Sequence, residues 1–562
     1  MTGHHSTDPL PLLRVPPFPG ADITRAKAIG TTASASKMPV TELLERLREA
    51  RVGGSYWAAQ PALPPKEYIL LRPKDRSQYI EILNKIKSHD PRNLFLWLPH
   101  HVRHREADSH IRIYQGDADP WHMLSGASAL WADSDDETAF IAALLNVEVQ
   151  LFGTSARFGS LVDMGEQALR HVATRELLHR DWIDPFTDLP CPVERMIDYC
   201  SEWRRLIDSN RPIKAAFGFG HWKQDTVDAL LWNGVDGHTP FAPATEHSLA
   251  AVPGGASIAV WKARVPESFL SSCEASAHTV YEVEDGFIRS VGLGADCVPP
   301  LSIIVDQVGV HYDPSQPSSL ENMLADGDIS PELLERARQL RELIVESRIS
   351  KYDVGEWAAL SRPGGELKHI LVLGQVEDDR SVLAGGGDVR SNLELLRRAR
   401  ATEPHAYILY KPHPDVLAGH RPGDIPEAEA LKYADEIVGK EPISALLDMV
   451  DGVHVITSLA GFEALLRGKA VTTHGTPFYA GWCLTTDLRA IPERRGRART
   501  LDELVAATLL LYPRYLDPVT GLPCPPEILI ERLRSGTRRE NRFLVMLRRT
   551  QGNLRRLIFG LR

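Results

Sequence analysis

The chain has 562 residues, of which 43% are hydrophobic and 25% are charged, and its formal net charge at pH 7 is −10. This length is too great for one hydrophobic core and predicts about three or four domains. The ordinary composition excludes a disordered or fibrous protein, and the negative charge argues against a general nucleic-acid binder.

The cysteine spacing and the lengths of the apolar runs indicate the cellular compartment in which the protein works. The six cysteines are scattered and show no CxxC pair, so we expect neither a disulfide framework nor a zinc knuckle. Residues 1–20 contain His and Pro where a signal peptide needs an apolar core, and no run reaches about 18 apolar residues. We therefore expect a cytoplasmic protein that does not span the membrane. His100, His101 and His104 lie close together, but no second ligand set accompanies them, so no metal is expected.

The predicted elements begin after a lead-in. Residues 1–55 are rich in Pro, Ala, Thr and Ser, with one short helical pattern at 41–51, and we expect them to be poorly ordered. Beyond them, short aliphatic runs alternate with amphipathic stretches, which predicts an α/β fold with parallel sheets. A helical pattern at 331–350 separates two Rossmann-like halves. The predicted buried strands are residues 213–217, 257–261, 279–283, 369–374, 406–410, 452–457 and 470–474.

The chain also repeats itself. Residues 184–192 match residues 517–525, and residues 94–100 parallel residues 407–413. Residues 56–205 are therefore expected to be a second copy of the C-terminal half alone. In place of Lys411, Thr457 and Ser458 this copy carries Leu98, Asp135 and Asp136. Because carboxylates repel an anion, we infer that the first copy has lost nucleotide binding.

An acidic motif follows the predicted strand at 279–283. Glu284 and Asp285 should emerge at the carboxyl edge of a sheet, where doubly wound folds bind ligands. A solvated turn is the alternative, because Asp-Gly is common in turns. Arg289 follows closely and, with the motifs below, favours a functional site.

A cation, an imidazole and two hydroxyls follow two later strands. Lys411 and His413 stand between prolines that limit backbone freedom, which suits a preorganised site for a leaving phosphate. Thr457 and Ser458 open a predicted helix, whose N-terminus attracts anions, although Ser458 could serve only as a helix cap. With the acid pair, these groups predict cleavage of a nucleotide-activated sugar.

Two further segments follow strand ends. Gln375 precedes the carboxylates Asp378 and Asp379, which could be a charged helix entry or could supply a nucleophile. Gly218 and Lys223 belong to a glycine-rich turn between a strand and a helix, a weak signal on its own for donor binding.

The last segment is basic. Residues 532–562 interleave arginines with apolar residues, which is typical of a charged terminal helix or of a segment that binds an anionic membrane surface. In an otherwise acidic chain we favour the membrane surface.

These motifs together resemble the capsule-polysaccharide β-Kdo transferases, the KpsC/LipB family of Gram-negative bacteria. The resemblance covers about residues 210–530 and, through the degenerate repeat, extends back to about residue 56. Members with two complete modules add Kdo at two linkages, whereas this chain keeps one module and half of another. The matching stretches are residues 284–294, 350–352, 374–376, 411–416, 457–468 and 475–482.

The resemblance implies a fold and a reaction. It implies a GT-B-like pair of Rossmann-type domains preceded by a degenerate half-module of the same type. It also implies CMP-Kdo as the donor, no metal, and retaining transfer to a phospholipid-linked Kdo acceptor at the inner face of the cytoplasmic membrane. Other capsule synthesis or export proteins are expected partners, and nucleic acid is not.

The same resemblance assigns roles to the motif residues. Asp379 would be the nucleophile, Glu284 the base that deprotonates the acceptor, and Asp285 its orienting neighbour. Arg289 would pair with the sugar carboxylate or brace the turn. The donor would be held by Lys411, His413, Thr457 and Ser458 at the phosphate, by Glu463 near the ribose, and by Gln375, Gly218 and Lys223.

The expected organisation has five parts: residues 1–55, the degenerate copy at 56–205, an acceptor-side half at 206–349, a CMP-sugar-binding half at 350–531 and the basic tail at 532–562. Two other functions stay open. One is a transferase for another CMP-ulosonic acid such as sialic acid, and the other is a non-catalytic assembly or export partner. The acceptor, the linkage position and the oligomeric state are left open.

Overall fold

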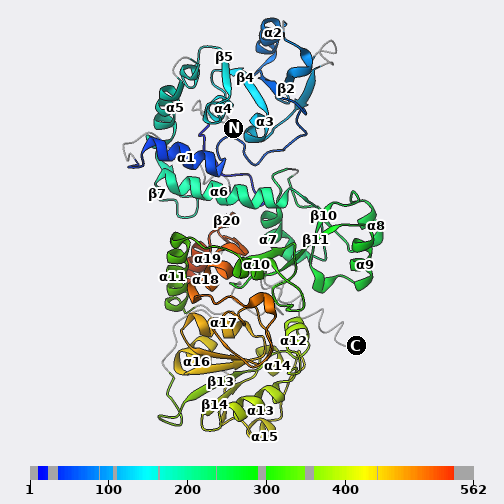
Figure 1. Ribbon diagram of the computed structural model, residues 1–562, viewed down its shortest axis with the longest axis vertical. Helices are drawn as coiled ribbons and strands as arrows, with labels where there is room; N and C mark the ends of the chain where they lie inside the picture. Colours follow the sequence, from blue (N-terminus) through cyan, green and yellow to red (C-terminus); the bar gives the residue numbers. More distant parts are fainter. Residues whose placement is uncertain are drawn as a thin grey trace, which may run out of the picture. The chain divides into compact units, whose positions relative to one another are not determined.

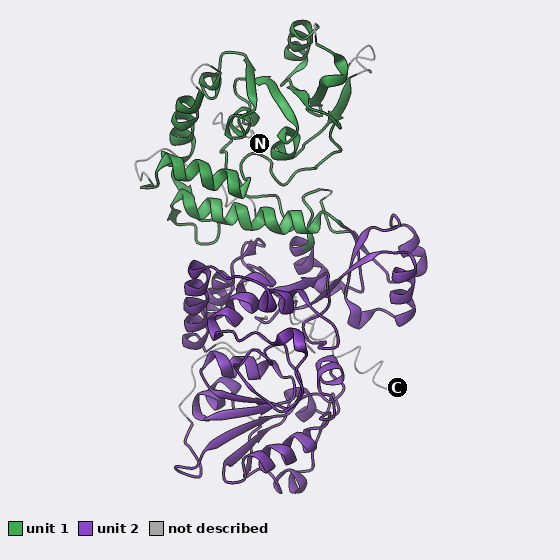
Figure 2. Ribbon diagram, in the orientation of Figure 1, with its two compact units in different colours: residues 1–212, 231–239 green, residues 213–230, 240–562 purple. Residues whose placement is uncertain are grey.

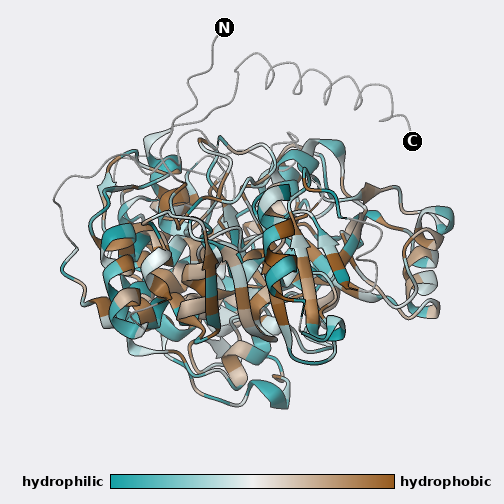
Figure 3. Ribbon diagram, turned by 90° about the horizontal axis from the view of Figure 1, so that it is seen from above, coloured by the Kyte–Doolittle hydropathy of each residue, from teal (hydrophilic) through white to brown (hydrophobic). Residues whose placement is uncertain are grey.

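A computed structural model describes residues 10–22, 36–87, 89–104, 111–162, 165–235, 237–288, 299–348, 360–439 and 441–536. The chain forms two compact units (Figure 2): unit 1 comprises residues 1–212 and 231–239, and unit 2 comprises residues 213–230 and 240–562. Hydrophobic residues, brown in Figure 3, concentrate on the strands, while the helices show both brown and teal residues.

Unit 1 is built on a five-stranded parallel sheet with the strand order β3-β2-β1-β4-β5 (Figure 1). From β1 to β3 each new strand is added on one side of the sheet, and β4 and β5 are added on the other side of β1. Doubly wound folds bind ligands at this point, between β1 and β4. The strands are β1 Tyr68–Arg72, β2 Leu94–Leu98, β3 Arg112–Gln115, β4 Ala127–Asp133 and β5 Glu148–Phe152. The helices are α1 Val40–Ala50, α2 Arg76–Lys85, α3 Pro120–Leu124, α4 Thr138–Leu144, α5 Gly165–Ala173 and α6 Val193–Asn210.

The lead-in was expected to be poorly ordered, and this expectation is wrong for its described residues. Leu12, Leu13 and Phe18 are at most 3% exposed, and the Phe18 ring lies 5.1 Å from that of Trp232. Helix α1 confirms the helical pattern at 41–51, and its leucines are buried. Scattered apolar residues between prolines bury enough surface to anchor an irregular segment.

Unit 2 contains two sheets. The first has seven strands in the order β20-β19-β12-β11-β10-β8-β9, and β12 runs antiparallel to its neighbours β11 and β19. Its strands are β8 Ile213–Phe217, β9 Phe241–Ala242, β10 Ser257–Val260, β11 Thr279–Asp285, β12 Ser302–Asp306, β19 Pro513–Leu516 and β20 Pro523–Cys524. The helices of this part are α7 His221–Leu231, α8 Glu246–Ala250, α9 Glu267–Ala275, α10 Ser319–Ala325, α11 Pro331–Glu346, α18 Leu501–Val505 and α19 Pro526–Ser535.

The second sheet of unit 2 is parallel throughout, with the order β15-β14-β13-β16-β17-β18. Its strands are β13 His369–Leu373, β14 Tyr407–Lys411, β15 Glu436–Ile437, β16 Gly452–Val455, β17 Ala470–Thr473 and β18 Thr486–Asp487. Its helices are α12 Arg380–Gly385, α13 Asn392–Thr402, α14 Pro414–Leu417, α15 Glu427–Ala430, α16 Ile443–Met449 and α17 Leu459–Leu466. β13 and β16 are buried along their whole length, as expected for strands covered by helices on both faces.

The internal repeat is visible in the hydrogen bonds. The Asp184 amide donates to the Leu189 carbonyl at 2.9 Å, and the Asp517 amide donates to the Leu522 carbonyl at 2.9 Å. Asp188 and Gly521, which directly precede these two leucines, occupy equivalent positions, and both have positive φ, of 58° and 73°. The five strands of unit 1 also follow the same order as the first five of the six-stranded sheet. The structure thus confirms a GT-B-like pair of sheets preceded by a half-module of the same type.

Candidate functional site

The acidic motif lies at the end of β11 and not in a solvated turn. Glu284 and Asp285 are the last strand residues and pair with β12. Gly286 follows where the chains approach closely, because a Cβ there would lie 2.3 Å from the Ser302 hydroxyl. The glycine therefore lets β11 end against β12, with the carboxylates at the strand end.

Each acid of this strand end contacts a specific group. The Lys223 ammonium lies 2.9 Å from Asp285 Oδ1, and Lys262 forms an ion pair with Glu282. Glu284 Oε1 lies 3.5 Å from the Tyr312 hydroxyl, at the outer limit of a hydrogen bond. Each of the three acids is thus held by a different side chain, and none of these side chains belongs to β11.

The glycine-rich turn also lies at these acids. The side chain of Lys223 is 6% exposed, and its ammonium lies 3.3 Å from the centre of the Trp261 ring. Gly218 has a φ of +83°, and a Cβ there would lie 2.8 Å from the Trp261 carbonyl oxygen. The turn therefore packs against Trp261 and positions Lys223 beside Asp285. Donor binding by Gly218 and Lys223 stays a prediction.

Tyr312 and Arg380 join the acids to the loop after β13. The Arg380 guanidinium donates to the Tyr312 hydroxyl at 3.4 Å and to the Lys262 carbonyl at 3.3 Å. Burial, and after it the charge of Glu284, raises the pKa of Tyr312, so its hydroxyl stays protonated and can donate to the carboxylate. Arg380 directly follows Asp379, so the contacts of the Arg380 side chain join the segment that carries Asp379 to the segment that carries Tyr312.

Gln375 and Thr457 meet at the reversal point of the six-stranded sheet, one from the loop after β13 and the other from the loop after β16. The Thr457 amide donates to Gln375 Oε1 at 2.8 Å, and Gln375 Nε2 donates to the Thr457 hydroxyl at 3.2 Å. The Gln375 amide in turn donates to Asn392 Oδ1 at 2.8 Å. The predicted phosphate ligand Thr457 is thus fixed by neutral groups, which do not repel an anion.

Asp379 caps helix α12. Its Oδ1 accepts from the Ser381 amide at 2.9 Å and from the Ser381 hydroxyl at 2.8 Å. The Thr457 hydroxyl donates to the same Ser381 hydroxyl at 3.2 Å. Asp378 instead forms an exposed ion pair with Arg421 at 2.7 Å. Of the two aspartates, Asp379 is therefore the one connected to Thr457.

His413 and Lys411 follow β14 at the same sheet edge. The Asp415 amide donates to His413 Nδ1 at 3.1 Å, so Nδ1 is the acceptor and the proton of the neutral ring is on Nε2. Such a ring can donate to an anion through Nε2. The Lys411 ammonium donates to the Glu441 carbonyl at 2.8 Å.

Ser458 directly precedes α17, and Glu463 lies within it. The Ser458 hydroxyl accepts from the Ala460 amide at 3.3 Å, so it caps the helix as the sequence allowed. Its carbonyl accepts from the Tyr479 hydroxyl at 2.5 Å, and Gly461 lets that ring approach, because a Cβ there would lie 2.2 Å from the hydroxyl oxygen. Glu463 is 8% exposed within the helix. The position of its carboxylate near a ribose stays a prediction.

Two motifs that are far apart in the sequence pack together. The ring of Phe287, next to the acids, lies 4.9 Å from that of Phe478 and 4.9 Å from that of His311. Phe478 also contacts Phe462 of α17, at 5.4 Å between ring centres. These rings fix the acidic strand end relative to the helix that begins at Ser458. Arg289 and the segment 350–352 lie outside the described residues.

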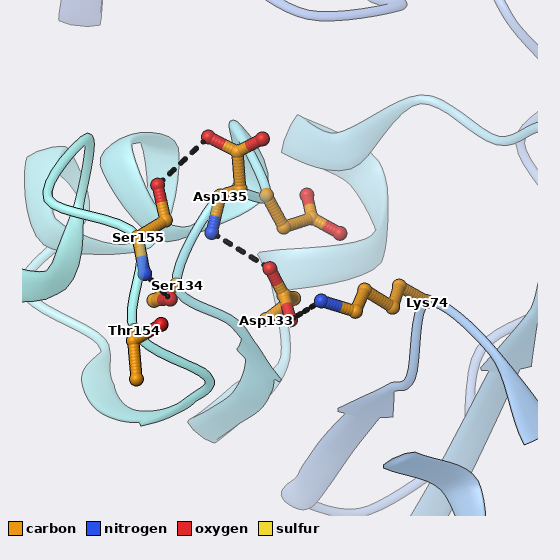
Figure 4. Close-up of a pocket in the computed structure, with 7 residues that line it drawn as sticks. Lys74, Asp133, Ser134, Asp135, Thr154 and Ser155 are labelled. Carbon is orange, nitrogen blue, oxygen red and sulfur yellow. Dashed lines mark hydrogen bonds and ion pairs between the residues drawn. The ribbon is translucent and has the colours of Figure 1, made fainter. Parts of the chain in front are cut away.

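In unit 1 the corresponding sheet edge encloses a cavity of about 470 Å³. Lys74 follows β1 and reaches Asp133 at the end of β4, with 2.8 Å between ammonium and Oδ2 (Figure 4). Asp135 accepts from the Ser155 hydroxyl at 3.1 Å. The Lys74 ammonium and backbone and side-chain donors lower the pKa of Asp133 despite its burial, so it is ionised. The remaining residues that line the cavity are Ser134, Asp136 and Thr154.

Sequence reasoning missed four groups of the site in unit 2. Ser381 had a local signal, because Asp followed two residues later by Ser is a common cap pattern. Tyr312, Lys262 and Arg380 had none, because they contact the acids only through the fold. Within the described ranges, no cluster of three or more His, Cys, Asp or Glu side chains could hold a metal ion, and no helix is long and apolar enough to cross a membrane.

Comparison with known proteins gives one family profile and several relatives. A family profile described as "Capsule polysaccharide biosynthesis protein" matches residues 258–362 and 361–515. The capsule polysaccharide modification protein LipA of Neisseria meningitidis serogroup A is 38% identical over 370 residues, which cover 65% of this chain and 52% of LipA. The chain spans about half the length of the curated relatives it matches.

Two solved structures also match. The β-Kdo 2,7-transferase of Thermosulfurimonas dismutans KpsC is 34% identical, and the match covers 57% of this chain and 98% of that one, with a TM-score of 0.47. The β-Kdo 2,4-transferase of the same protein is 32% identical with the same coverage and a TM-score of 0.49.

Proposed function

The chain belongs to the capsule polysaccharide biosynthesis family of KpsC and LipA, and we propose that it is a retaining glycosyltransferase that moves Kdo from CMP-Kdo to a lipid-linked Kdo acceptor. Kdo transfer is the activity named for the two KpsC transferases, and unit 2 has the groups that this chemistry needs.

One observation carries the proposal. Glu284 contacts Tyr312, and Tyr312 accepts from the side chain of Arg380, the residue that follows Asp379. The Asp379 carboxylate is linked through Ser381 to the neutral groups at Thr457, where we place the phosphate. A leaving phosphate, a nucleophile and a base are the three functions that double displacement at a glycosyl phosphate requires.

In the first step, a carboxylate oxygen of Asp379 attacks the anomeric carbon of Kdo. The bond from that carbon to the phosphate oxygen breaks, and CMP leaves with the electron pair. Thr457, Ser458 and the Nε2–H of His413 stabilise the charge that develops on the phosphate, with Lys411 nearby on the same strand end.

In the second step, the acceptor hydroxyl attacks the same carbon and gives its proton to Glu284. The ester bond to Asp379 breaks and the carboxylate is restored, so two inversions give net retention. Tyr312 orients Glu284, and Lys223 holds Asp285 beside it. Arg289 pairs with the sugar carboxylate in this scheme. Glu284 finally loses its proton to water.

The reaction is proposed to need no metal, because neutral donors and a cation already surround the phosphate position. Turnover should persist in excess EDTA, measured as CMP release. Loss of turnover in EDTA and its return with added Mg²⁺ would reject this part of the proposal.

The test of the function is a donor panel with the purified chain and a synthetic Kdo glycoside as acceptor. We expect CMP release and a new product with CMP-Kdo, with the anomeric configuration of the donor retained by NMR. A preference for CMP-sialic acid would show that the donor sugar is another ulosonic acid and not Kdo. No product with any CMP sugar would favour a non-catalytic assembly or export role.

We also propose that the protein works at the inner face of the cytoplasmic membrane through residues 532–562, of which residues 537–562 lie outside the described part of the chain. The support is their alternation of arginines with apolar residues. The chain should sediment with vesicles that contain anionic phospholipid, and a chain ending at residue 536 should not. Equal sedimentation of both would contradict the membrane role.

A further inference from the structure

Three hydrogen bonds between side chains run in one direction from Gln375 to Asp379. Gln375 Nε2 donates to the Thr457 hydroxyl at 3.2 Å, and that hydroxyl donates to the Ser381 hydroxyl at 3.2 Å. The Ser381 hydroxyl then donates to Asp379 Oδ1 at 2.8 Å. Each hydroxyl thus accepts one hydrogen bond and donates one to the next group.

An ordinary helix cap explains only part of this arrangement. A cap needs the bond from the Ser381 amide to Asp379 Oδ1, which is present at 2.9 Å. The bond between the Thr457 and Ser381 hydroxyls lies outside the cap and joins the loop after β16 to α12, between residues that are 76 positions apart. The approach is close, because a Cβ at Gly385 of α12 would lie 3.0 Å from Thr457 Cγ2.

A hydroxyl has one proton, so Thr457 can donate either to Ser381 or to a bound phosphate. When phosphate takes that proton, Ser381 keeps its bond to Asp379 but no longer accepts from Thr457, so the strength of that bond depends on whether the phosphate site is occupied. In the part of the chain that the structure describes, both hydrogen bonds to the Asp379 carboxylate fall on Oδ1. Oδ2 is therefore the oxygen presented for attack.

We propose that Ser381 is a positioning residue that couples occupation of the phosphate site at Thr457 to the orientation of the Asp379 carboxylate. This inference rests on the proposed function for its kinetic consequence, whereas the coupling itself concerns anion binding alone. Ser381 holds Oδ1, so Oδ2 faces the sugar while the phosphate is seated on Thr457.

The kinetic test compares Ser381→Ala with Ser381→Thr, which keeps a hydroxyl. The alanine variant should lower kcat about 10- to 100-fold with a change in KM for CMP-Kdo of less than about threefold, because orientation is lost while donor binding stays. The threonine variant should recover most of kcat. Ser391→Ala is the control for the loss of a serine hydroxyl at a helix start, because the Ser391 side chain caps α13 by accepting from the Glu394 amide.

A pH profile separates positioning from a purely structural role. A hydroxyl that donates to a carboxylate favours the ionised form, so loss of the Ser381 hydroxyl should move the acid limb of kcat/KM to higher pH. A variant that is merely less stable would keep the wild-type limb. An unchanged limb and unchanged kcat in Ser381→Ala would overturn the proposal, as would equal losses in Ser391→Ala.

A binding cycle tests the coupling without turnover. The affinity for CMP is measured by calorimetry for the wild type, Asp379→Asn, Ser381→Ala and the double variant. Asp379→Asn should change the affinity several-fold when Ser381 is present and less than about twofold when it is absent. Additive effects would overturn the inference even if transfer occurs. A wild type that binds CMP with this coupling but transfers no sugar would contradict the proposed function instead.

Discussion

In unit 1 the strand order reverses between β1 and β4, and carboxylates such as Asp133 and Asp135 lie at that point. In unit 2 it reverses between β13 and β16, and the amide of Gln375 and the hydroxyls of Thr457 and Ser381 lie there. The two sheets thus share a strand order and differ in the charge they present to a ligand. We therefore predict that one topology supports or rejects an anion according to a few loop residues.

The aspartates of unit 1 are satisfied by the protein itself. Asp133 accepts from Lys74 and from Gln78, and Asp136 accepts from Arg72 at 2.7 Å. These cations neutralise part of the charge that a phosphate would meet. The contrast locates the proposed chemistry in unit 2, and the following changes would break or sharpen it.

Asp379→Asn should have the largest effect. Without the carboxylate no glycosyl ester can form, so kcat should fall at least about 10³-fold with the fold intact. CMP release with CMP-Kdo is the measurement. Asp378→Asn is the control. Because Asp378 forms only an exposed ion pair with Arg421, its loss should change kcat less than about twofold. Turnover of Asp379→Asn near the wild-type rate would remove that residue from the mechanism.

Glu284→Gln should lower kcat about 100-fold or more, because the acceptor hydroxyl loses its base. Tyr312→Phe should lower it about 10-fold or less, since only the orientation of Glu284 is lost. Initial rates at saturating donor distinguish the two. Equal effects of both changes would show that Glu284 is not the base.

Exchanging the loop residues tests the comparison directly. Replacing Thr457 and Ser458 together by Asp, the residues at the equivalent positions 135 and 136, should weaken CMP binding about 100-fold through charge repulsion. Calorimetry with CMP measures the change. An affinity within about threefold of the wild type would mean that the hydroxyls do not contact the phosphate.

Acid sensitivity should also differ between the two sheets. His454 and His474 are buried in the six-stranded sheet, 3.0 Å apart between ring nitrogens, and burial lowers their pKa values to about 4 and about 3. The equivalent residues of unit 1 are Ala132 and Phe152, both buried. A histidine with a depressed pKa is neutral in both states above pH 6.5. Below it only the unfolded state gains protons, so stability is lost as the pH falls.

For this pair the loss of stability at pH 5 is about 4 kcal/mol. Hydrogen exchange followed from pH 7 to pH 5 should show the amides of β16 and β17 becoming labile before those of β4 and β5. His474→Phe should reduce the difference. Equal loss of protection in both sheets would contradict this account.

The smallest effect is expected in the cavity of unit 1. We infer that the charged loops of unit 1 do not hold the nucleotide. Asp135→Asn should therefore leave CMP affinity and kcat within about twofold, and the whole chain should bind one CMP. Calorimetric stoichiometry is the check. Two CMP per chain, or loss of one upon Asp135→Asn, would show that unit 1 still binds nucleotide.

The sequence predicted the parallel strands closely, because buried strands between helices are continuous apolar runs. The prediction of residues 213–217 coincides with β8, and that of residues 369–374 differs from β13 by one residue. The antiparallel strand β12 was not predicted, since its pairing with β11 is decided by tertiary contacts. The lead-in was misjudged because composition does not reveal that Leu12 and Phe18 are buried.

The candidate site was predictable where a motif has a local geometry and not where the fold brings side chains together. Gln375 and Thr457 follow strands that are neighbours in the sheet, so their meeting could be expected from topology. Tyr312 lies in an irregular segment and reaches Glu284 only through the packing of unit 2. The ion pair of Lys223 with Asp285 was not foreseen, because Lys223 reaches the acid only through the fold, and its role at the donor stays a prediction.

Trapping the glycosyl ester tests the central claim most directly. The Glu284→Gln chain is mixed with CMP-Kdo without acceptor, and its intact mass and peptides are measured. The account predicts release of one CMP and a mass gain of one Kdo residue on the peptide that contains Asp379, absent when Asp379→Asn is added. CMP release during transfer to an added acceptor, with no adduct in any variant, would contradict it.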